Sequence, residues 1–315
     1  MGRYLVNTVV LLTTYQGEKH LPALLASLQA QTDPDFTVLY QDDGSDDASP
    51  ELLEKAARED SRFRPGREQR RRLGAAGNFL SLIRQTEGNY LLCCDQDDLW
   101  EPEKIAALKE AMREAESRYG CETPILVHSD CSLIDEEGNQ VGKSFFAHQG
   151  WDPKAVTLPR LLVQNNVTGC TLMMNRPLQK LIAAHGQAKD LFMHDWFIAL
   201  TAAAFGRIVF VSRPLTRYRQ HGENAIGASK KSLPLRALKA VRERDQAKRR
   251  ILLTYTHTLV FRRLYGESLP PEALSLVDAY LATRTMKKIP RVMTVRRLGC
   301  TMQSPLTRMG QILFG

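Results

Sequence analysis

The feature that most constrains the fold is an alternation of short apolar runs with helix-like segments in the first half of the chain. Residues 4–13, 36–40 and 90–94 are apolar or β-branched runs typical of buried strands. Residues 18–31, between the first two runs, place leucines at helical spacing. This alternation predicts an α/β fold with a mostly parallel sheet flanked by helices. In such sheets, ligands bind at the carboxyl ends of the strands.

Polar and acidic clusters follow these three strands. They are TTYQGE at 13–18, QDDGSDD at 41–47 and DQDD at 95–98. Because parallel strands end at the same edge of a sheet, these clusters are expected to lie together. Carboxylates suit a divalent cation and the hydroxyl or amide donors of a nucleoside. The sequence therefore places its candidate site at this edge.

The DQDD cluster has two interpretations. Alternate residues of an extended segment point to the same side, so Asp95 and Asp97 can share a hard divalent cation. The structural alternative is a helix start, with Asp98 as the N-cap and the carboxylates favoured by the helix dipole. Capping by Asp98 does not require the other two carboxylates, so we favour the metal site.

Three further positions have a functional and a structural interpretation. Asp42 can accept hydrogen bonds from a base or ribose, whereas the Asp-Gly pair at 43–44 is also a common turn. Asp195 opens an apolar helix and is either a general base or the helix N-cap. His221, in the segment YRQHGEN at 218–224, is either a metal ligand or an exposed loop histidine.

Charge divides the chain into two parts. Residues 229–315 contain 18 Lys and Arg against 5 Asp and Glu, a net +13, which leaves −5 of the total +8 for residues 1–228. We predict a catalytic domain at 1–228 and a basic helical region at 229–315. This region has no recognisable nucleic-acid-binding signature, so no nucleic acid partner is expected. It is predicted to bind an anionic membrane surface; the alternative is a packed helical subdomain with a solvated basic face.

The bulk composition, 43% hydrophobic and 25% charged, is that of a soluble globular protein. No apolar run reaches 18 residues and the apolar start lacks a cleavage site, so neither a spanning helix nor export is expected. The six cysteines lack zinc-type spacing and are expected to be thiols. The expected location is cytoplasmic, peripheral on the inner face of the cytoplasmic membrane.

The order of these segments resembles that of the family-2 inverting glycosyltransferases, whose catalytic domain has the GT-A (Rossmann-like) fold. The resemblance covers residues 6–229, and DQDDLW, HDW and YRQHG are most similar to bacterial rhamnosyltransferases of cell-surface polysaccharide assembly. Residues 64–72 depart from the pattern, because they are basic where the family has a hydrophobic strand. That edge strand is expected to be short or missing. The matching segments are TTYQGEKHLPALLASLQAQT, VLYQDDGSDD, LGAAGNF, LLCCDQDDLWEPEKI, VTGCTLMMNR, FMHDWFIAL and YRQHGENAIG.

The resemblance implies a role for each matching position. Asp195 would be the catalytic base, and Asp97 with His221 would hold Mg or Mn. The implied reaction moves L-rhamnose from dTDP-L-rhamnose, or a hexose from a UDP-sugar, to a hydroxyl of a glycan or lipid-linked glycan. The positions that would contact the nucleotide-sugar are Thr14, Tyr15, Glu18, Asp42, Asp43, Asn78, Asp95 and Gln96.

Two other classes of protein are the alternatives. A sugar nucleotidyltransferase would use a similar sheet and magnesium, but it needs a glycine-rich basic loop after the first strand, and TTYQGEKH has one glycine. A non-catalytic glycan- or lipid-binding scaffold could retain the same acidic residues. No GxGxxG follows any predicted strand, which argues against a dinucleotide-dependent dehydrogenase.

Overall fold

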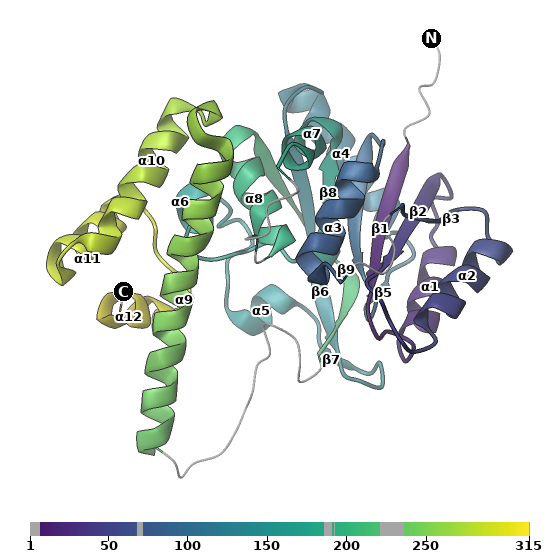
Figure 1. Cartoon of the computed structure of the whole chain (residues 1–315), viewed down its shortest axis with the longest axis horizontal. Coiled ribbons are helices and arrows are strands. Elements are labelled where there is room, and N and C mark those ends of the chain that lie inside the picture. The colour runs from purple at the N-terminus through teal and green to yellow at the C-terminus, as the bar shows by residue number, and fades with distance from the viewer. Residues whose placement is uncertain (1–6, 68–71, 186–190, 192, 221–235, 315) are drawn as a thin grey trace. The chain divides into compact units, whose positions relative to one another are not determined.

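The computed structural model of the chain describes residues 7–67, 72–185, 191, 193–220 and 236–314 (Figure 1). The chain divides into two compact units. The first is Met1–Phe145 with Val167–Arg219, and the second is Phe146–Asn166 with Gln220–Gly315. The second unit thus takes a segment from the middle of the chain as well as the C-terminal region. A functional boundary between residues 228 and 229 stays a prediction.

The first unit is built on one mixed sheet. The strands are β1 (Thr8–Thr14), β2 (Phe36–Asp42), β3 (Phe63–Pro65), β4 (Tyr90–Asp95), β5 (Leu99–Trp100), β6 (Ile125–Ile134), β7 (Gln140–Gly142), β8 (Leu172–Asn175) and β9 (Arg207–Arg219). Their order is β3-β2-β1-β4-β8-β6-β9-β5, and β7 pairs with β6. The first four run parallel to one another, as predicted. In contrast, β8 is antiparallel to both of its neighbours.

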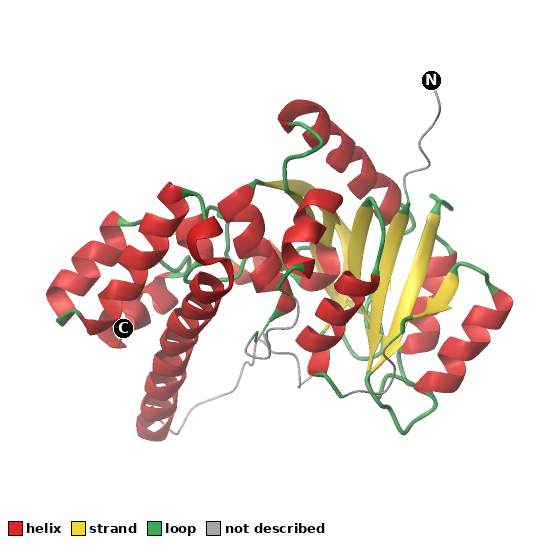
Figure 2. Ribbon diagram, turned by 45° about the horizontal axis from the view of Figure 1, so that its top comes forward, coloured by secondary structure: helices red, strands yellow, loops and turns green. Residues whose placement is uncertain are grey.

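Helices cover both faces of this sheet, which confirms the predicted α/β class (Figures 1 and 2). On one face, α1 (Leu21–Gln29), α2 (Ser49–Glu59) and α4 (Lys104–Tyr119) contribute to the main apolar core. The four predicted leucines of α1 are all buried there. The other face carries α3 (Gly74–Gln85), α7 (Arg176–Ala183) and α8 (His194–Phe205). Because the helices pack on the faces of the sheet, loops rather than helices follow the carboxyl ends of β1, β2 and β4.

Two segments have irregular strand structure. Residues 166–174 have a strand-like sequence but do not form one strand, because a 3-10 turn at Gly169–Thr171 comes before β8. The basic segment after Phe63 forms the three-residue strand β3, so the edge strand is short rather than missing. Residues 68–71, within that basic segment, lie outside the described residues.

The second unit is helical in its described C-terminal part. It contains α6 (Leu158–Leu161), α9 (Arg236–Tyr265), α10 (Pro271–Ala282), α11 (Lys288–Arg297) and α12 (Pro305–Phe314), while α5 (Phe145–Gln149) begins at the unit boundary. Tyr255 of α9 stacks on Tyr280 of α10 with ring centroids 4.9 Å apart. Arg160 donates to the carbonyl and hydroxyl oxygens of Thr301, at 2.8 and 2.6 Å. In the described residues, no helix combines the length and apolar character needed to span a membrane.

Three buried histidines make the stability of the protein sensitive to acid. Burial lowers the pKa of His128 and His194 to about 3 and that of His257 to about 4. Because these values lie below the unfolded-state value, the unfolded chain binds more protons and stability is lost as the pH falls below about 6.5. At about pH 5.5, each neutral histidine accounts for about 1.4 kcal/mol of this loss.

The variant His128→Leu is expected to lose less stability on acidification than the wild type, because one of these protonation sites is gone. Thermal unfolding measured at about pH 7.5 and about pH 5.5 tests this through the difference in melting temperature. His148→Leu is the matched control, because His148 is exposed. An acid-induced decrease as large in His128→Leu as in the wild type would contradict the prediction.

Candidate active site

The carboxyl ends of β1, β2 and β4 lie side by side. Thr13 of β1 pairs with Gln41 of β2 and with Asp95 of β4, and Thr14 pairs with Asp42. The three polar clusters therefore leave the sheet at one edge, as predicted. The candidate site is built from the loops that follow.

The loop after β1 is attached to the DQDD loop through a side-chain amide. Gln96 donates to the carbonyl of Tyr15 at 2.8 Å and accepts from its N–H at 2.7 Å. Gly17 makes room for this pairing, because a Cβ there would lie 2.8 Å from Cδ of Gln96. The Tyr15 side chain stays 50% exposed beside the site. Gln96 thus positions Tyr15, and a direct contact of its amide with a ligand stays a prediction.

Both carboxylates of the β2 cluster are engaged with the protein. Asp42 is buried and accepts from Thr14 Oγ1 at 3.0 Å and from the N–H groups of Gly44 and Ser45. Asp43 accepts from the N–H groups of Leu73 and Gly74, at 2.6 and 2.8 Å. Asp43 therefore connects the end of β2 to the beginning of α3. Both residues therefore shape the loop that follows β2.

Two further predicted contact residues also stabilise this edge. Glu18 accepts from the N–H of Ala48, the N-cap residue of α2, at 2.9 Å. Asn78 is buried in α3, where it donates to the Gln41 carbonyl at 3.2 Å and accepts from the Gln41 amide. These bonds hold the loops after β1 and β2 in place. Direct ligand contacts by Glu18 and Asn78 stay predictions.

The DQDD loop concentrates negative charge. Burial raises the pKa of Asp95 well above its usual value, and the charges of Asp98, Asp97 and Asp195 add to the effect. The Asp98 side chain is fully buried, and burial together with Asp97 raises its pKa to about 7. Asp97 keeps part of its surface exposed. The structure therefore brings the carboxylates of the DQDD loop close to that of Asp195.

Asp98 is not a helix cap. The N-cap residue of α4 is Glu103, and Asp98 Oδ1 accepts from the backbone N–H of Arg219 at 3.0 Å. The buried Arg219 guanidinium donates to the carbonyl of Asp97 at 2.9 Å, and to those of Asp135 and Glu136 at 2.9 and 2.7 Å. The end of β9 therefore fixes the backbone of the DQDD loop.

A buried lysine compensates part of this negative charge. Lys104 is 0% exposed, donates to the Cys170 carbonyl at 2.6 Å and lies with Nζ 3.4 Å from the ring centroid of Trp100. Burial lowers its pKa to about 8, whereas Asp98 and Asp95 act in the opposite direction. Its buried ammonium therefore stabilises the charged forms of Asp95 and Asp98.

Asp195 lies in the first turn of α8 rather than at its cap. The N-cap residue is Met193, so the capping alternative is wrong. Asp195 is buried, and its Oδ1 accepts from the N–H of Trp196 at 2.7 Å. His194 stacks on Phe79 of α3 with ring centroids 4.0 Å apart. At Gly169 a Cβ would lie 2.8 Å from His194 Nε2, so this glycine lets α8 approach the 3-10 turn.

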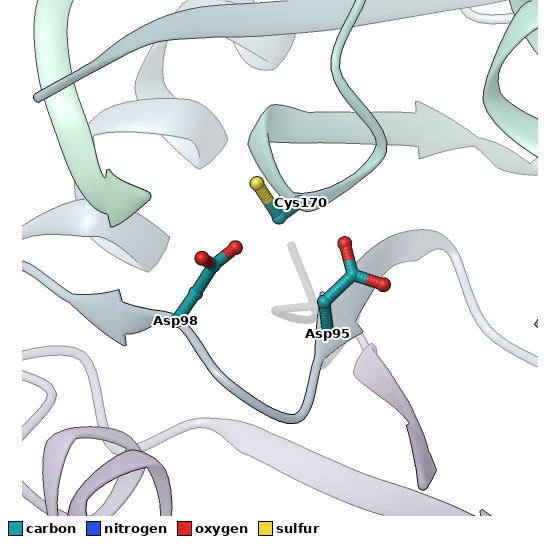
Figure 3. Close-up of side chains that lie close together, drawn as sticks. All are labelled: Asp95, Asp98 and Cys170. Carbon is teal, nitrogen blue, oxygen red and sulfur yellow. The ribbon is translucent and has the colours of Figure 1, made fainter. Parts of the chain in front are cut away.

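Asp95, Asp98 and Cys170 form a group whose ligand-type atoms all lie within 4.8 Å (Figure 3). The buried ammonium of Lys104 beside Cys170 disfavours a cation within this group. Hard divalent ions prefer oxygen ligands over thiols. Asp97, with its partly exposed carboxylate next to Asp95, fits such an ion better. His221, the other predicted ligand, lies outside the described residues.

The sequence does not predict the buried Lys104 ammonium or the contact of Arg219 with the DQDD loop. A lysine in the first turn of a helix is unfavourable because the helix dipole is positive there. The position of Lys104 at the beginning of a predicted helix was thus the one available signal. The backbone contacts of Arg219 follow from the pairing of β9, which the sequence does not reveal.

Comparisons with known proteins agree with this architecture. A model of glycosyl transferase family 2 matches residues 9–181. EpsH of Bacillus subtilis (strain 168), a glycosyltransferase by name, is 26% identical over 231 residues, covering 71% of this chain and 64% of EpsH. The dTDP-rhamnosyl transferase RfbG of Shigella flexneri is 24% identical over 230 residues, covering 69% and 74%. The chain thus spans less than two thirds of the length of EpsH.

Solved structures show the same fold. S. aureus TarS 1-349 in complex with UDP-GlcNAc aligns with a TM-score of 0.57 at 17% identity, covering 97% of this chain and 88% of that one. The mannosyltransferase PcManGT from Pyrobaculum calidifontis, in complex with GDP-Man and Mn2+, aligns with a TM-score of 0.52 at 15% identity, covering 94% and 74%. Since the family model matches more than half of the sequence, the chain belongs to glycosyl transferase family 2 and has its GT-A fold.

Proposed function

We propose that this protein is an inverting glycosyltransferase that uses a nucleotide-sugar donor and a divalent cation in cell-surface polysaccharide synthesis. The observation that carries the proposal is the convergence of Asp95, Asp97 and Asp195 at the edge of the sheet. The charges of Asp97 and Asp195 both raise the pKa of Asp95. Paired acidic groups of this kind can hold a cation and accept a proton. Family membership supports the same chemistry.

The finer assignment concerns donor, acceptor and location. We favour dTDP-L-rhamnose as the donor, because RfbG is named a dTDP-rhamnosyl transferase, with a UDP-hexose as the rival. The acceptor would be a hydroxyl of a glycan or a lipid-linked glycan. The protein would act at the inner face of the cytoplasmic membrane, with an anionic membrane surface as a partner of its basic C-terminal region.

The predicted site residues would each take a separate part in binding and catalysis. Tyr15, positioned by Gln96, would lie against the nucleoside, and the loop organised by Asp42 would support it. Asp97 would ligate Mg or Mn, with His221 as a further ligand. The cation would neutralise charge on the leaving diphosphate. Arg219 holds the Asp97 backbone in place for this contact.

Asp195 would act as the general base. Its carboxylate would take the proton from the acceptor hydroxyl while that oxygen attacks the anomeric carbon from the side opposite the nucleotide. The bond to the diphosphate breaks in the same step, so the anomeric configuration inverts. The contact with the Trp196 N–H holds Oδ1 of the base in a fixed position.

Nucleotide binding tests the proposed function directly. We expect dTDP or UDP to raise the melting temperature in the presence of Mg or Mn, because a ligand that binds only the folded state stabilises it. Asp97→Asn should lose most of the metal-dependent part of this shift. Asp278→Asn on α10 is the control, because it removes a carboxylate that pairs with Arg262 instead.

The competing functions predict other outcomes in the same assay. Stabilisation by a nucleoside triphosphate with a sugar phosphate, and not by diphosphates, would favour a nucleotidyltransferase. No shift with dTDP, UDP or GDP under any metal would overturn the donor site and favour a non-catalytic scaffold.

Gly17→Ala is expected to weaken nucleotide binding by about tenfold, because the new methyl group displaces Gln96 and releases the Tyr15 backbone. Titration calorimetry with the nucleotide that stabilises the wild type measures this change. Gly310→Ala is the matched control, because its Cβ would meet Ala247 at an ordinary 3.5 Å within a helix. Equal affinities of Gly17→Ala and wild type would show that Tyr15 needs no such positioning.

A further inference from the structure

The outer face of α11 in the second unit presents apolar side chains to solvent. Ile289 is 74% exposed and Met293 is 67% exposed, more than any other large apolar side chain among the described residues. They are four residues apart, so they project from the same side of the helix. The opposite side of α11 is packed, since Val295 is buried. The helix is thus held in place while its apolar outer face stays uncovered.

Cations bracket these two apolar side chains. Lys287 and Lys288 come just before Ile289, and Arg296 and Arg297 follow Met293 by one turn, all four exposed. None of the four forms an ion pair with a residue that the structure describes. No acidic residue follows Asp278, whereas seven Lys and Arg do: Arg284, Lys287, Lys288, Arg291, Arg296, Arg297 and Arg308. The outer face of α11 therefore combines apolar tips with uncompensated positive charge.

We propose that this face, Ile289 and Met293 with Lys287, Lys288, Arg296 and Arg297, docks on an anionic lipid surface. The apolar side chains would enter the boundary between headgroups and acyl chains, and the cations would contact anionic headgroups. Two projecting side chains on a ten-residue helix are a small area, whereas a stable protein interface needs about 800 Å² per partner. Shallow insertion combined with charge attraction does not need such an area. The inference deepens the proposed function, because a lipid-linked acceptor would lie at the same surface.

Vesicle flotation with the full chain tests the inference. We expect binding to phosphatidylcholine vesicles that contain phosphatidylglycerol, weak binding to phosphatidylcholine alone, and a decrease at high salt. The double variant Ile289→Ser with Met293→Ser should bind the anionic vesicles about tenfold more weakly. Arg296→Gln with Arg297→Gln should reduce binding by a similar factor.

Matched controls come from exposed positions of the first unit. Val141→Ser removes a 57% exposed apolar side chain. Lys55→Gln with Arg58→Gln removes two exposed cations from α2. Both controls should bind vesicles like the wild type. Equal loss in these controls, or equal binding to neutral and anionic vesicles, would overturn the assignment of this face.

A second copy of the chain is the competing occupant. A wild-type dimer that the Ile289→Ser, Met293→Ser variant dissociates in analytical ultracentrifugation, with vesicle binding unchanged, would overturn the membrane assignment. Nucleotide binding without vesicles separates this inference from the proposed function. Intact nucleotide binding with absent vesicle binding rejects the membrane face alone, and the opposite result rejects the donor site alone.

Discussion

Asp195→Asn is expected to lower the rate of sugar transfer by about a thousandfold or more while nucleotide binding persists. An asparagine amide has nearly the shape of the carboxylate and can still accept from the Trp196 N–H, so the first turn of α8 should be preserved. It cannot take a proton from an attacking hydroxyl. The loss should therefore appear in kcat and leave the affinity for nucleotide within about twofold.

Release of dTDP or UDP from the donor, with a bacterial membrane extract supplying acceptors, measures this effect. Asp278→Asn again serves as the control, because it changes a carboxylate outside the first unit. A variant that transfers sugar at a rate near that of the wild type would exclude Asp195 as the base. A variant that loses nucleotide binding as well would indicate a structural role for the carboxylate.

Lys104→Met is expected to reduce the free energy of unfolding by about 3 to 5 kcal/mol, the usual result of removing one charge from a buried set of opposite charges. The methionine fills a similar volume against Trp100, so the loss comes mainly from the uncompensated carboxylates. The Cys170 carbonyl keeps a partner in Thr216, whose hydroxyl donates at 3.3 Å. Denaturant unfolding monitored by circular dichroism measures the change.

The dependence on pH distinguishes charge from packing. Without the ammonium, the pKa of Asp98, already raised to about 7, should rise further. A raised carboxyl pKa means that the folded protein holds the proton more tightly, so stability falls as the pH rises through that value. Lys104→Met should thus be more destabilised at about pH 7.5 than at about pH 5.5. A loss that is equal at both values would indicate a packing defect.

The double variant Lys104→Met with Asp98→Asn is the matched test of the same idea. If charge compensation links the two residues, the double variant should be more stable than Lys104→Met alone, because one buried carboxylate fewer is then left without its cation. Additive losses would mean that Lys104 and Asp98 act independently. Arg219 can still donate its N–H to the asparagine oxygen, so the loop keeps that contact.

The local sequence pattern was sufficient to predict the strands and helices whose apolar residues recur at regular spacing. The apolar runs at β1, β2 and β4 and the leucines of α1 predict buried elements because each needs a partner surface. The antiparallel β8 could not be predicted, since the 3-10 turn before it lies against His194 and Asp195, which are distant from it in sequence.

For the acidic side chains, too, the sequence predicted their presence at the site, and the structure decided their contacts. From the sequence, Asp98 was expected to cap a helix, and Asp195 was suited both to cap a helix and to act as a general base, because both uses need a carboxylate near a helix start. The structure rejects both caps, since Glu103 and Met193 hold those positions. For Gln96, the amide pairs with Tyr15 across 81 positions of sequence, a contact that no local pattern contains.

The sequence by itself determined that this is an α/β protein of glycosyl transferase family 2 with acidic residues at the ends of its first strands, because hydrophobic periodicity and residue order are local properties. The tertiary structure alone decided how those residues are used. It buried the Lys104 ammonium where it acts on Asp95 and Asp98, and it placed Arg219 against the Asp97 backbone. The physical reason is that burial and charge compensation arise between segments distant in sequence, and they exist only once β9, α4 and the DQDD loop have packed together.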